Sequence, residues 1–451
     1  MSHYLRPRKI THVFFMLVSL LWFGAIVSRA TPYYVATNGP GGAATEWGNA
    51  KSNIQDAISL CSSGDVVWVS NGVYQTGGIT NWPSGGVLTN RVAITTQYVT
   101  VRSANNDPAN TIIKGAWNPN TTNGPVAVRC VYMTNNTTLI GFTITNGATV
   151  TLNETIADAD LVGGGIYFKG IISNCVIAGN SSYGSGSTEG GGGANGGTCF
   201  NCTLIGNSTR LRGGGANGVV LSNCTVACNR ANGGGGGVYA STLYNCLVIS
   251  NTSPGNAGGT YYSSLYNCTV AYNVASGAGA GAMYPTLARN CLVYGNQGAG
   301  VSLGNGHKVE SCTIVGNSYG LNQTSGGPQT NIILNCIIYS NETYNWTPYA
   351  NSAFMFTNTC ITPTNIALAD FLAAGNTTNN PILINFGSGY GTNHVAGNYR
   401  LSPNSPCVNS GLYQSWMTNA VDMDGRVRIR YGTVDMGAYE RINSGAIFGF
   451  H

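Results

Sequence analysis

The stretch NCTVAYN, residues 267–273, sets a cysteine directly after one asparagine and places a second asparagine five residues beyond that cysteine. The pattern recurs at cysteines separated by 27, 22, 22, 22, 23, 21 and 24 residues. These are Cys175, Cys202, Cys224, Cys246, Cys268, Cys291, Cys312 and Cys336. Each has an asparagine five residues later, and all follow an asparagine except Cys312, which follows Ser311. Self-similarity at this period indicates a solenoid.

Two further apolar positions accompany each cysteine. An aliphatic residue stands two positions later, as Val270 does after Cys268, which is the period of a strand with one buried face. Another apolar residue stands three positions earlier, as Leu265 does. Because an odd offset between two inward positions breaks the alternation, the chain must turn a corner at the asparagine before the cysteine.

Glycine clusters that run into a short strand, such as GGGVY at 235–239, lie upstream of these positions. One repeat of about 22 residues therefore holds about three short strands and three corners, which predicts one coil of a parallel β-helix. Stacked coils put equivalent residues about 4.8 Å apart, so every position becomes a column. Asparagine tolerates the left-handed backbone of a corner and its amide can bond along a column, while cysteine packs as a small hydrophobe. We therefore expect asparagine ladders and an inward cysteine ladder.

This repeat resembles the right-handed parallel β-helix proteins of the pectate-lyase-like superfamily, and its rhythm is similar to repeats in bacterial polymorphic outer-membrane proteins. Near the C-terminus, YRLSPNSPCVNSG (399–411) and DMDGRVRIRYGTVDMGAYE (422–440) resemble the closing segment of choice-of-anchor Q proteins. The resemblance implies an all-β, right-handed parallel β-helix solenoid. It does not fix an activity, since this fold carries lyases, hydrolases, adhesins and structural shells.

The first thirty residues predict a secretory signal peptide. Basic residues precede an apolar run from Val13 to Val27, and Ser28 and Ala30 suit a cleavage site. Fifteen apolar residues fall short of the ~20 that a membrane-spanning helix needs. We therefore expect a secreted or cell-surface bacterial protein whose mature chain has no transmembrane helix.

A short helix is expected to plug the open N-terminal end of the solenoid, whose edge would otherwise template aggregation. Ser52 and Gln55 can form a capping box at its start, and Gly64 can end it. Its apolar face is expected to consist of Ile54, Ala57, Ile58 and Cys61. The expected organisation is a signal peptide (1–30), an N-terminal cap with the first strands (31–75), irregular early coils (76–160), regular coils (161–345), late irregular coils (346–398), a closing segment (399–441) and a tail (442–451).

The charge balance excludes a nucleic-acid partner. Four of the 20 Lys and Arg residues lie in the leader. The mature chain therefore has 16 basic residues against 15 Asp and Glu, and its net charge is close to zero. A basic footprint for nucleic acid is absent.

Few carboxylates are available for catalysis. A calcium-dependent lyase needs several to hold the metal, and a β-helix hydrolase needs paired or triple aspartates. Between residues 161 and 399 the only acids are Asp370, Glu189, Glu310 and Glu342. A lyase could instead hold a uronate with Arg210, Arg212 and Arg230 and use Lys308 or His307 near the base. The alternative is that these are solvated loop charges. His394 is isolated and expected at the surface.

Tyrosines recur at fixed distances from the cysteines. Tyr239, Tyr261 and Tyr284 stand seven residues before successive cysteines, and Tyr244 and Tyr266 stand two before theirs. Each set is predicted to form a column. An exposed column would offer flat apolar faces with hydroxyl rims for sugar rings, whereas the alternative is that ring stacking only stabilises the sheet.

The ladder cysteines are expected to be free thiols, because β-carbons a full strand spacing apart exceed the ~3.8 Å of a disulfide. Cys360 and Cys407 lie outside the ladder and could pair. Asp422 and Asp424, followed by Gly425, resemble a calcium loop, although a turn is the alternative. No other cofactor is expected.

The favoured hypothesis is a secreted β-helix protein that does not catalyse a reaction. It would bind a glycan or a cell-envelope partner. The first alternative is a polysaccharide lyase that cleaves uronate polymers by β-elimination. The second is a purely structural surface protein.

Overall fold

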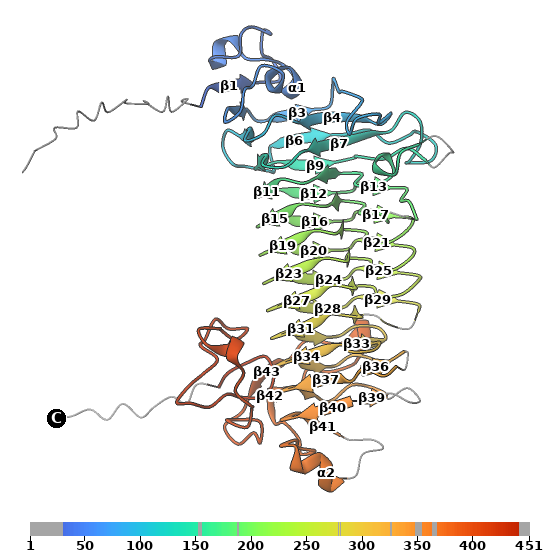
Figure 1. The fold of residues 1–451 in the computed structure, drawn as a ribbon, viewed down its shortest axis with the longest axis vertical. Helices are drawn as coiled ribbons and strands as arrows, with labels where there is room; N and C mark the ends of the chain where they lie inside the picture. Colours follow the sequence, from blue (N-terminus) through green and yellow to red (C-terminus); the bar gives the residue numbers. More distant parts are fainter. Residues whose placement is uncertain are drawn as a thin grey trace, which may run out of the picture.

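The protein winds into a long solenoid of stacked parallel strands (Figure 1). The computed structural model describes residues 30–151, 156–186, 189–277, 279, 281–324, 327–347, 354–362 and 368–441. Residues 1–29 of the predicted signal peptide and the predicted tail at 442–451 lie outside this part of the chain. The all-β solenoid predicted from the repeat is confirmed.

Three long parallel sheets, named A, B and C here, run along the solenoid. Sheet A contains β1 (Pro32–Val35), β2 (Val66–Val69), β5 (Thr100–Ser103), β8 (Thr138–Ile140), β11 (Ile171–Ser173), β15 (Thr198–Phe200), β19 (Val220–Ser222), β23 (Thr242–Tyr244), β27 (Ser264–Tyr266), β31 (Leu287–Arg289), β34 (Lys308–Glu310), β37 (Asn331–Leu334) and β40 (Phe354–Thr357). Sheet B contains β3 (Gly72–Tyr74), β6 (Thr111–Lys114), β9 (Thr143–Thr145), β12 (Val176–Ala178), β16 (Thr203–Ile205), β20 (Thr225–Ala227), β24 (Leu247–Ile249), β28 (Thr269–Ala271), β32 (Leu292–Tyr294), β35 (Thr313–Val315), β38 (Ile337–Ile338) and β41 (Cys360–Ile361). Sheet C contains β4 (Thr89–Ile94), β7 (Val128–Met133), β10 (Ile166–Phe168), β14 (Ala194–Asn195), β18 (Ala216–Asn217), β22 (Val238–Tyr239), β26 (Thr260–Tyr261), β30 (Ala282–Met283), β33 (Ala299–Leu303), β36 (Tyr319–Gln323) and β39 (Tyr344–Thr347).

Five central coils carry a fourth short strand, which the repeat did not reveal. These strands form a small parallel sheet of β13 (Ser181–Ser182), β17 (Ser208–Thr209), β21 (Arg230–Ala231), β25 (Thr252–Ser253) and β29 (Val274–Ala275). Each has only two residues, so its period could not be read from the sequence.

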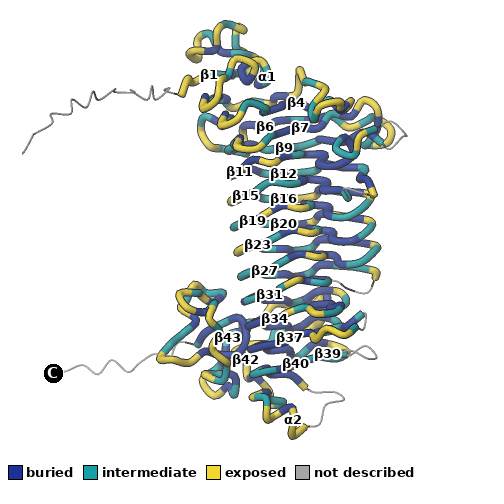
Figure 2. The backbone as a smooth tube through the Cα atoms, viewed as in Figure 1, coloured by how far each residue is buried: buried dark blue, intermediate teal, exposed yellow. Residues whose placement is uncertain are grey.

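The predicted inward columns are confirmed. On sheet A, Leu221, Leu243 and Leu265 pair in register, and all three are fully buried. On sheet B, Val226, Val248 and Val270 do the same. Buried stretches recur at equivalent places in successive coils, while exposed stretches gather at the N-terminal loops, the C-terminal segment and α2 (Figure 2).

The corner before each ladder cysteine is also confirmed. The eight preceding residues have φ between 49° and 55°, and Ser311, the one residue that is not asparagine, has φ 50°. Some of these corner amides bond to one another, as Asn245 Nδ2 does to Asn223 Oδ1 at 3.2 Å. Asparagine suits this position because it enters the left-handed region at low cost.

The asparagines that follow the cysteines form the predicted ladder, but they do not themselves take the left-handed backbone of the corner. At this second corner the residue before the asparagine takes the positive φ, as Ser250 does at 57°, and the asparagine side chain is buried. Asn229 Nδ2 donates to Asn251 Oδ1 at 3.0 Å and to Leu204 O at 2.9 Å. The same amide-to-amide bond joins Asn180, Asn207, Asn229, Asn251, Asn273, Asn296, Asn317 and Asn341 in sequence. The asparagine ladder is therefore an interior feature.

The inward cysteine ladder is confirmed, and all of its thiols are free and buried. The thiols also form hydrogen bonds, which packing alone did not predict. Cys268 Sγ donates to Tyr266 O at 3.2 Å, and at the end of the column Thr359 Oγ1 makes the equivalent bond to Thr357 O at 3.0 Å. Burial raises the pKa of Cys291 and Cys336 well above that of an ordinary thiol, so both stay protonated.

Helix α1 (Ile54–Ile58) closes the N-terminal end of the solenoid as predicted, but its ends differ from the prediction. The N-cap is Asn53, whose side chain accepts the Gln55 N–H at 2.8 Å, and not Ser52. The helix ends at Ile58, well before Gly64. Gln55 instead bonds through its side chain to β4, accepting the Ala93 N–H at 2.7 Å. This amide therefore occupies the free edge of sheet C.

A second helix, α2 (Leu368–Ala373), lies at the other end of the solenoid and was not predicted (Figure 1). Its one buried residue, Phe371, packs edge-on against Phe356 with ring centroids 6.1 Å apart. The described residues also contain four short 3-10 helices. Two lie in the first half of the chain, η1 (Trp47–Asn49) and η2 (Asp158–Asp160), and two lie in the C-terminal segment, η3 (Gly391–Asn393) and η4 (Ser415–Met417). Among the described residues, no helix is long and apolar enough to cross a membrane.

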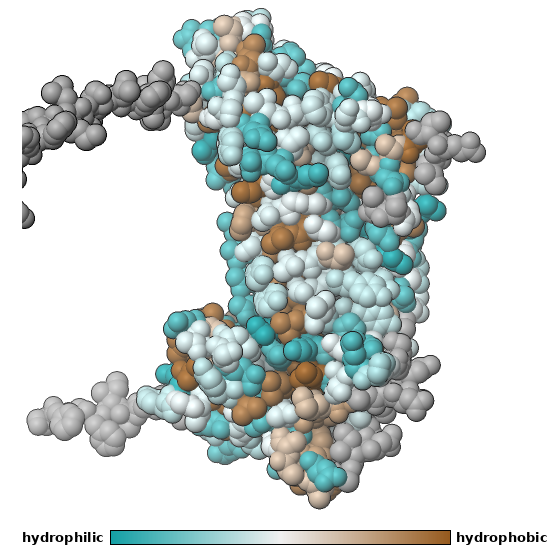
Figure 3. Space-filling view, viewed as in Figure 1, coloured by the Kyte–Doolittle hydropathy of each residue, from teal (hydrophilic) through white to brown (hydrophobic). Residues whose placement is uncertain are grey.

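The C-terminal segment folds back along the outside of sheet B. It begins with the antiparallel pair β42 (Leu383–Asn385) and β43 (Asn398–Leu401), and it buries Leu401 and Met436 against Val315 and Ile337 of the coils. We call residues 383–441 the closing layer. Figure 3 shows hydrophobic side chains in separate groups over the coils, the closing layer and α2.

Buried polar groups hold the closing layer in place. Arg428 is fully buried, donates to Asn290 Oδ1 at 3.3 Å and pairs with Glu440 at 3.1 Å. The expectation that His394 lies at the surface is wrong, because it is buried with Nε2 2.6 Å from the Tyr399 hydroxyl. Cys360 on β41 and Cys407 of this layer lie in the same buried cluster, and both are free thiols.

Replacing Asn251 by alanine is expected to destabilise the fold by ~3 kcal/mol or more. The change removes the acceptor of the Asn229 backbone N–H and Nδ2 and the side-chain donor to Val226 O and Asn273 Oδ1, and the loss of hydrogen bonds by buried polar groups is costly. The measurement is urea unfolding followed by circular dichroism. Asn223→Gly, at an exposed corner that keeps its positive φ, is the control and should cost less than ~1 kcal/mol. Equal losses in the two variants would contradict the role of the ladder.

The thiol hydrogen bond can be isolated by comparing Cys268→Thr with Cys268→Val. The two side chains have nearly the same shape, but only threonine keeps a donor for Tyr266 O, as Thr359 does naturally. We expect the threonine variant to be more stable by ~1 kcal/mol in urea unfolding. A valine variant of equal stability would show that the cysteine acts as a filler alone.

Candidate functional site

Three of the predicted tyrosines, Tyr239, Tyr261 and Tyr284, lie together beside sheet C, but not in the single column that the sequence predicted. Tyr239 and Tyr261 pair in register, and their ring centroids lie 5.6 Å apart. Tyr261 then pairs with Met283, so the prediction that Tyr284 continues this column is wrong. The repeat has an extra residue between β30 and β31, and counting back from Cys291 therefore misplaces Tyr284 by one position.

Tyr262, which the sequence analysis did not select, joins the two groups of rings. Its ring stacks on Tyr261 at 4.5 Å and lies 5.3 Å from Tyr284. Tyr284 in turn stacks on His307 at 5.6 Å with the ring planes 7° apart. These five residues, Tyr239, Tyr261, Tyr262, Tyr284 and His307, form a continuous patch that we call the aromatic strip.

The strip has a buried base and an exposed surface. Tyr261 is only 6% exposed and packs with Ala257 and Met283 in a small apolar cluster. Tyr262 lies over it and is 47% exposed. Tyr239, Tyr284 and His307 are half-buried. The strip therefore stabilises the sheet at its base and presents a ring face to solvent at Tyr262.

The strip is electrically neutral near pH 7. Burial lowers the pKa of His307, whose Nδ1 lies 3.0 Å from Pro285 O and so carries the proton of the neutral ring. The pKa of Tyr262 is raised to about 12, mainly by burial and to a smaller extent by the neighbouring Tyr261. The Tyr262 hydroxyl therefore remains protonated and can donate a hydrogen bond.

Arg212 is the one predicted basic residue besides His307 that joins the strip. Its guanidinium lies 5.3 Å from the centre of the Tyr239 ring and 5.6 Å from that of Tyr261. An ion pair of 2.6 Å with Glu189 neutralises it. The sequence could not show this pair, because Glu189 comes from the preceding coil.

The other predicted basic residues lie elsewhere. Arg210 is exposed and stacks on Tyr183 at 4.3 Å, and Arg230 is exposed on β21. Lys308 is exposed on β34. In the part of the chain that the structure describes, no shared partner brings Arg210, Arg212 and Arg230 together.

The second predicted tyrosine column is confirmed on the outside of sheet A. Tyr244 and Tyr266 pair in register and stack at 4.9 Å with planes 13° apart. The next residue of the column, Arg289, pairs with Glu310 at 2.8 Å and stacks on Trp416 of the closing layer at 4.6 Å. Beside this column, a groove of about 350 Å³ lies between the coils and the closing layer, with Asn245 and Asn267 on one wall.

The predicted calcium candidates bind groups of the protein itself. Asp422 Oδ1 accepts the backbone N–H of Asp424 at 2.9 Å and that of Arg426 at 2.8 Å. Asp424 Oδ2 accepts Arg400 Nε at 2.6 Å. Both carboxylates hold the closing layer together, and among the described residues no cluster of three or more acidic, histidine or cysteine side chains could hold a metal ion.

No family model and no curated protein matches the chain, so the resemblance of residues 399–440 to choice-of-anchor Q proteins stays a prediction. Among solved structures, a pectate lyase is 14% identical over 91% of this chain and 96% of its own, with a TM-score of 0.48. A rhamnogalacturonan lyase is 15% identical over 83% of this chain and 97% of its own, with a TM-score of 0.34. The A-module of a mannuronan C-5 epimerase from Azotobacter vinelandii is 13% identical over 69% of this chain and 95% of its own, with a TM-score of 0.37. At such values no activity or ligand can be transferred.

The His307 site predicts a pH effect on stability. Because burial lowers the folded-state pKa below the ordinary value of 6.5, stability from the neutral ring is present above pH 6.5 and is lost as the pH falls through the folded-state pKa. His307→Gln should remove this part of the pH dependence, measured as urea midpoints between about pH 7.5 and pH 5. Parallel pH profiles for the two proteins would contradict the assignment.

Proposed function

We propose that this protein is exported on its N-terminal leader and binds a glycan through the aromatic strip, without catalysing a reaction. The observation that carries the proposal is the Tyr262 ring, which is 47% exposed, stacked on Tyr261 and in tilted contact with Tyr284. A large aromatic ring fixed by its neighbours presents a rigid apolar face with a hydroxyl at its edge. Sugar rings offer the complementary surface, with apolar C–H faces and hydroxyl rims.

The charge of the strip favours binding over lyase chemistry. A β-elimination needs a cation to neutralise the uronate and a base to take the adjacent proton. Arg212 is already paired with Glu189, and His307 donates its Nδ1 proton to Pro285 O. The lyase remains the first alternative and a purely structural shell the second. A cell-envelope polysaccharide is the expected partner.

Tyr262→Ala is expected to weaken binding by about fivefold, since the loss of one stacked ring costs ~1 kcal/mol. The measurement is affinity electrophoresis of the full chain through gels that contain homogalacturonan, alginate, xylan or a neutral glucan. Tyr431→Ala is the matched control, because Tyr431 is 100% exposed in the closing layer and shares the positive φ of Tyr262.

The same polysaccharides should be incubated with the protein and assayed for unsaturated sugars. Release of such sugars that is lost in Lys308→Ala or His307→Ala would establish the lyase and refute a non-catalytic role. An absence of retention on every polysaccharide, without release, would leave the structural shell. Retention that Tyr262→Ala and Tyr431→Ala reduce equally would place the binding site elsewhere.

A further inference from the structure

The N-terminal end of the solenoid carries a second aromatic site, far along the axis from the aromatic strip (Figure 1). A cavity of about 710 Å³ opens there beside the first strands of sheet A. Its size falls within the ~300–1,000 Å³ typical of small-molecule sites. The residues that line it and carry the argument are Tyr34, Trp47, Trp68, Ser70, Asn71 and Asn105.

One wall of the cavity is aromatic. Tyr34 and Trp68 are in register on β1 and β2, and Trp47 on η1 meets the Tyr34 ring edge-on at 4.8 Å. The register of the coils continues to Arg102 on β5, whose guanidinium lies 4.4 Å from the centre of the Trp68 ring. Trp47 is 45% exposed although it has apolar neighbours. The Trp68 ring is thus fixed, while Trp47 presents an open face.

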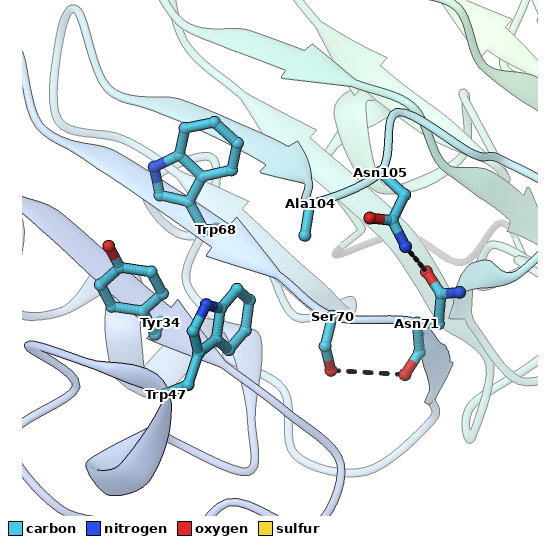
Figure 4. Close-up of a pocket in the computed structure, with 7 residues that line it drawn as sticks. All are labelled: Tyr34, Trp47, Trp68, Ser70, Asn71, Ala104 and Asn105. Carbon is cyan, nitrogen blue, oxygen red and sulfur yellow. Dashed lines mark hydrogen bonds between the residues drawn. The ribbon is translucent and has the colours of Figure 1, made fainter.

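Another part of the cavity is built of neutral polar groups, seen across from the rings in Figure 4. Asn105 Nδ2 donates to Asn71 Oδ1 at 3.3 Å, which orients both amides. The Asn71 Nδ2 and Asn105 Oδ1 atoms have no partner among the described residues. One donor and one acceptor are therefore free for a ligand. None of the described residues that line the cavity carries a charge.

We propose that this cavity binds a neutral sugar, with a pyranose ring stacked on Trp47 and its hydroxyls bonded to the Asn71 and Asn105 amides. Aromatic rings suit the C–H face of a sugar, and an amide that both donates and accepts suits a hydroxyl. A uronate fits less well, because no lining residue carries a charge and the neighbouring Arg102 guanidinium lies over the Trp68 ring. The site is separate from the aromatic strip, and the inference does not depend on the proposed function.

The test is isothermal titration of the full chain with cello-, malto-, xylo- and manno-oligosaccharides and, as the acidic arm, oligogalacturonate. At least one neutral oligosaccharide should bind, and Trp47→Ala should weaken it by tenfold or more. Trp117→Ala is the matched control, because Trp117 is also 45% exposed but does not line the cavity, and it should bind as the native chain does. Asn105→Ala, which removes only an exposed amide, should weaken binding about threefold and guards against misfolding of the tryptophan variant.

Tyr262→Ala separates the two sites. Neutral sugar binding that survives Tyr262→Ala and fails in Trp47→Ala supports the inference, even where the aromatic strip binds no polymer. The inference is overturned if no neutral oligosaccharide binds at millimolar concentration, or if Trp47→Ala and Asn105→Ala leave binding unchanged. It is also overturned if oligogalacturonate binds this site more tightly than every neutral sugar, or if only a peptide of residues 1–29 occupies it.

Discussion

The hydrogen bond from each buried asparagine amide to the next is the interaction on which the rest of this structure depends. In the central coils it joins residues 22 positions apart, such as Asn229 and Asn251. Each amide also holds a backbone carbonyl of the previous coil, as Asn251 Nδ2 holds Val226 O. A shift of register by one residue would break these bonds and expose the inward aliphatic positions together. The ladder therefore fixes which side chains lie above one another everywhere in the solenoid.

The outer surface inherits this register. The column of sheet A that stacks Tyr244 on Tyr266 also aligns Tyr34 with Trp68 and Arg102 at the N-terminal end. Ring-to-ring and ring-to-cation contacts thus arise wherever neighbouring coils carry such residues at one position. Aromatic and charged surfaces of this solenoid therefore form as columns, and the side chains of a few coils determine the character of each surface.

The sequence predicted those features that repeat with the coil and missed those that do not. The cysteine and aliphatic columns and the corners at Asn245 and Asn267 follow from spacing alone. Tyr262 was missed because the neighbouring coils have no tyrosine doublet, and Tyr284 was misplaced because the next corner is one residue longer. The burial of His394 depends on a closing layer that packs on coils distant in the sequence, and periodicity carries no information about such contacts.

The regular spacing of 22 residues between ladder partners in the central coils determines how the solenoid can change in length. All contacts of the ladder run to the coil above or below, so a duplicated 22-residue segment would meet the same neighbours that its template meets. Internal duplication or loss of one such unit lengthens or shortens the molecule while both helical caps and the closing layer keep their own partners. The length of this solenoid can thus change in steps of one whole coil without a change in the contacts between neighbouring coils.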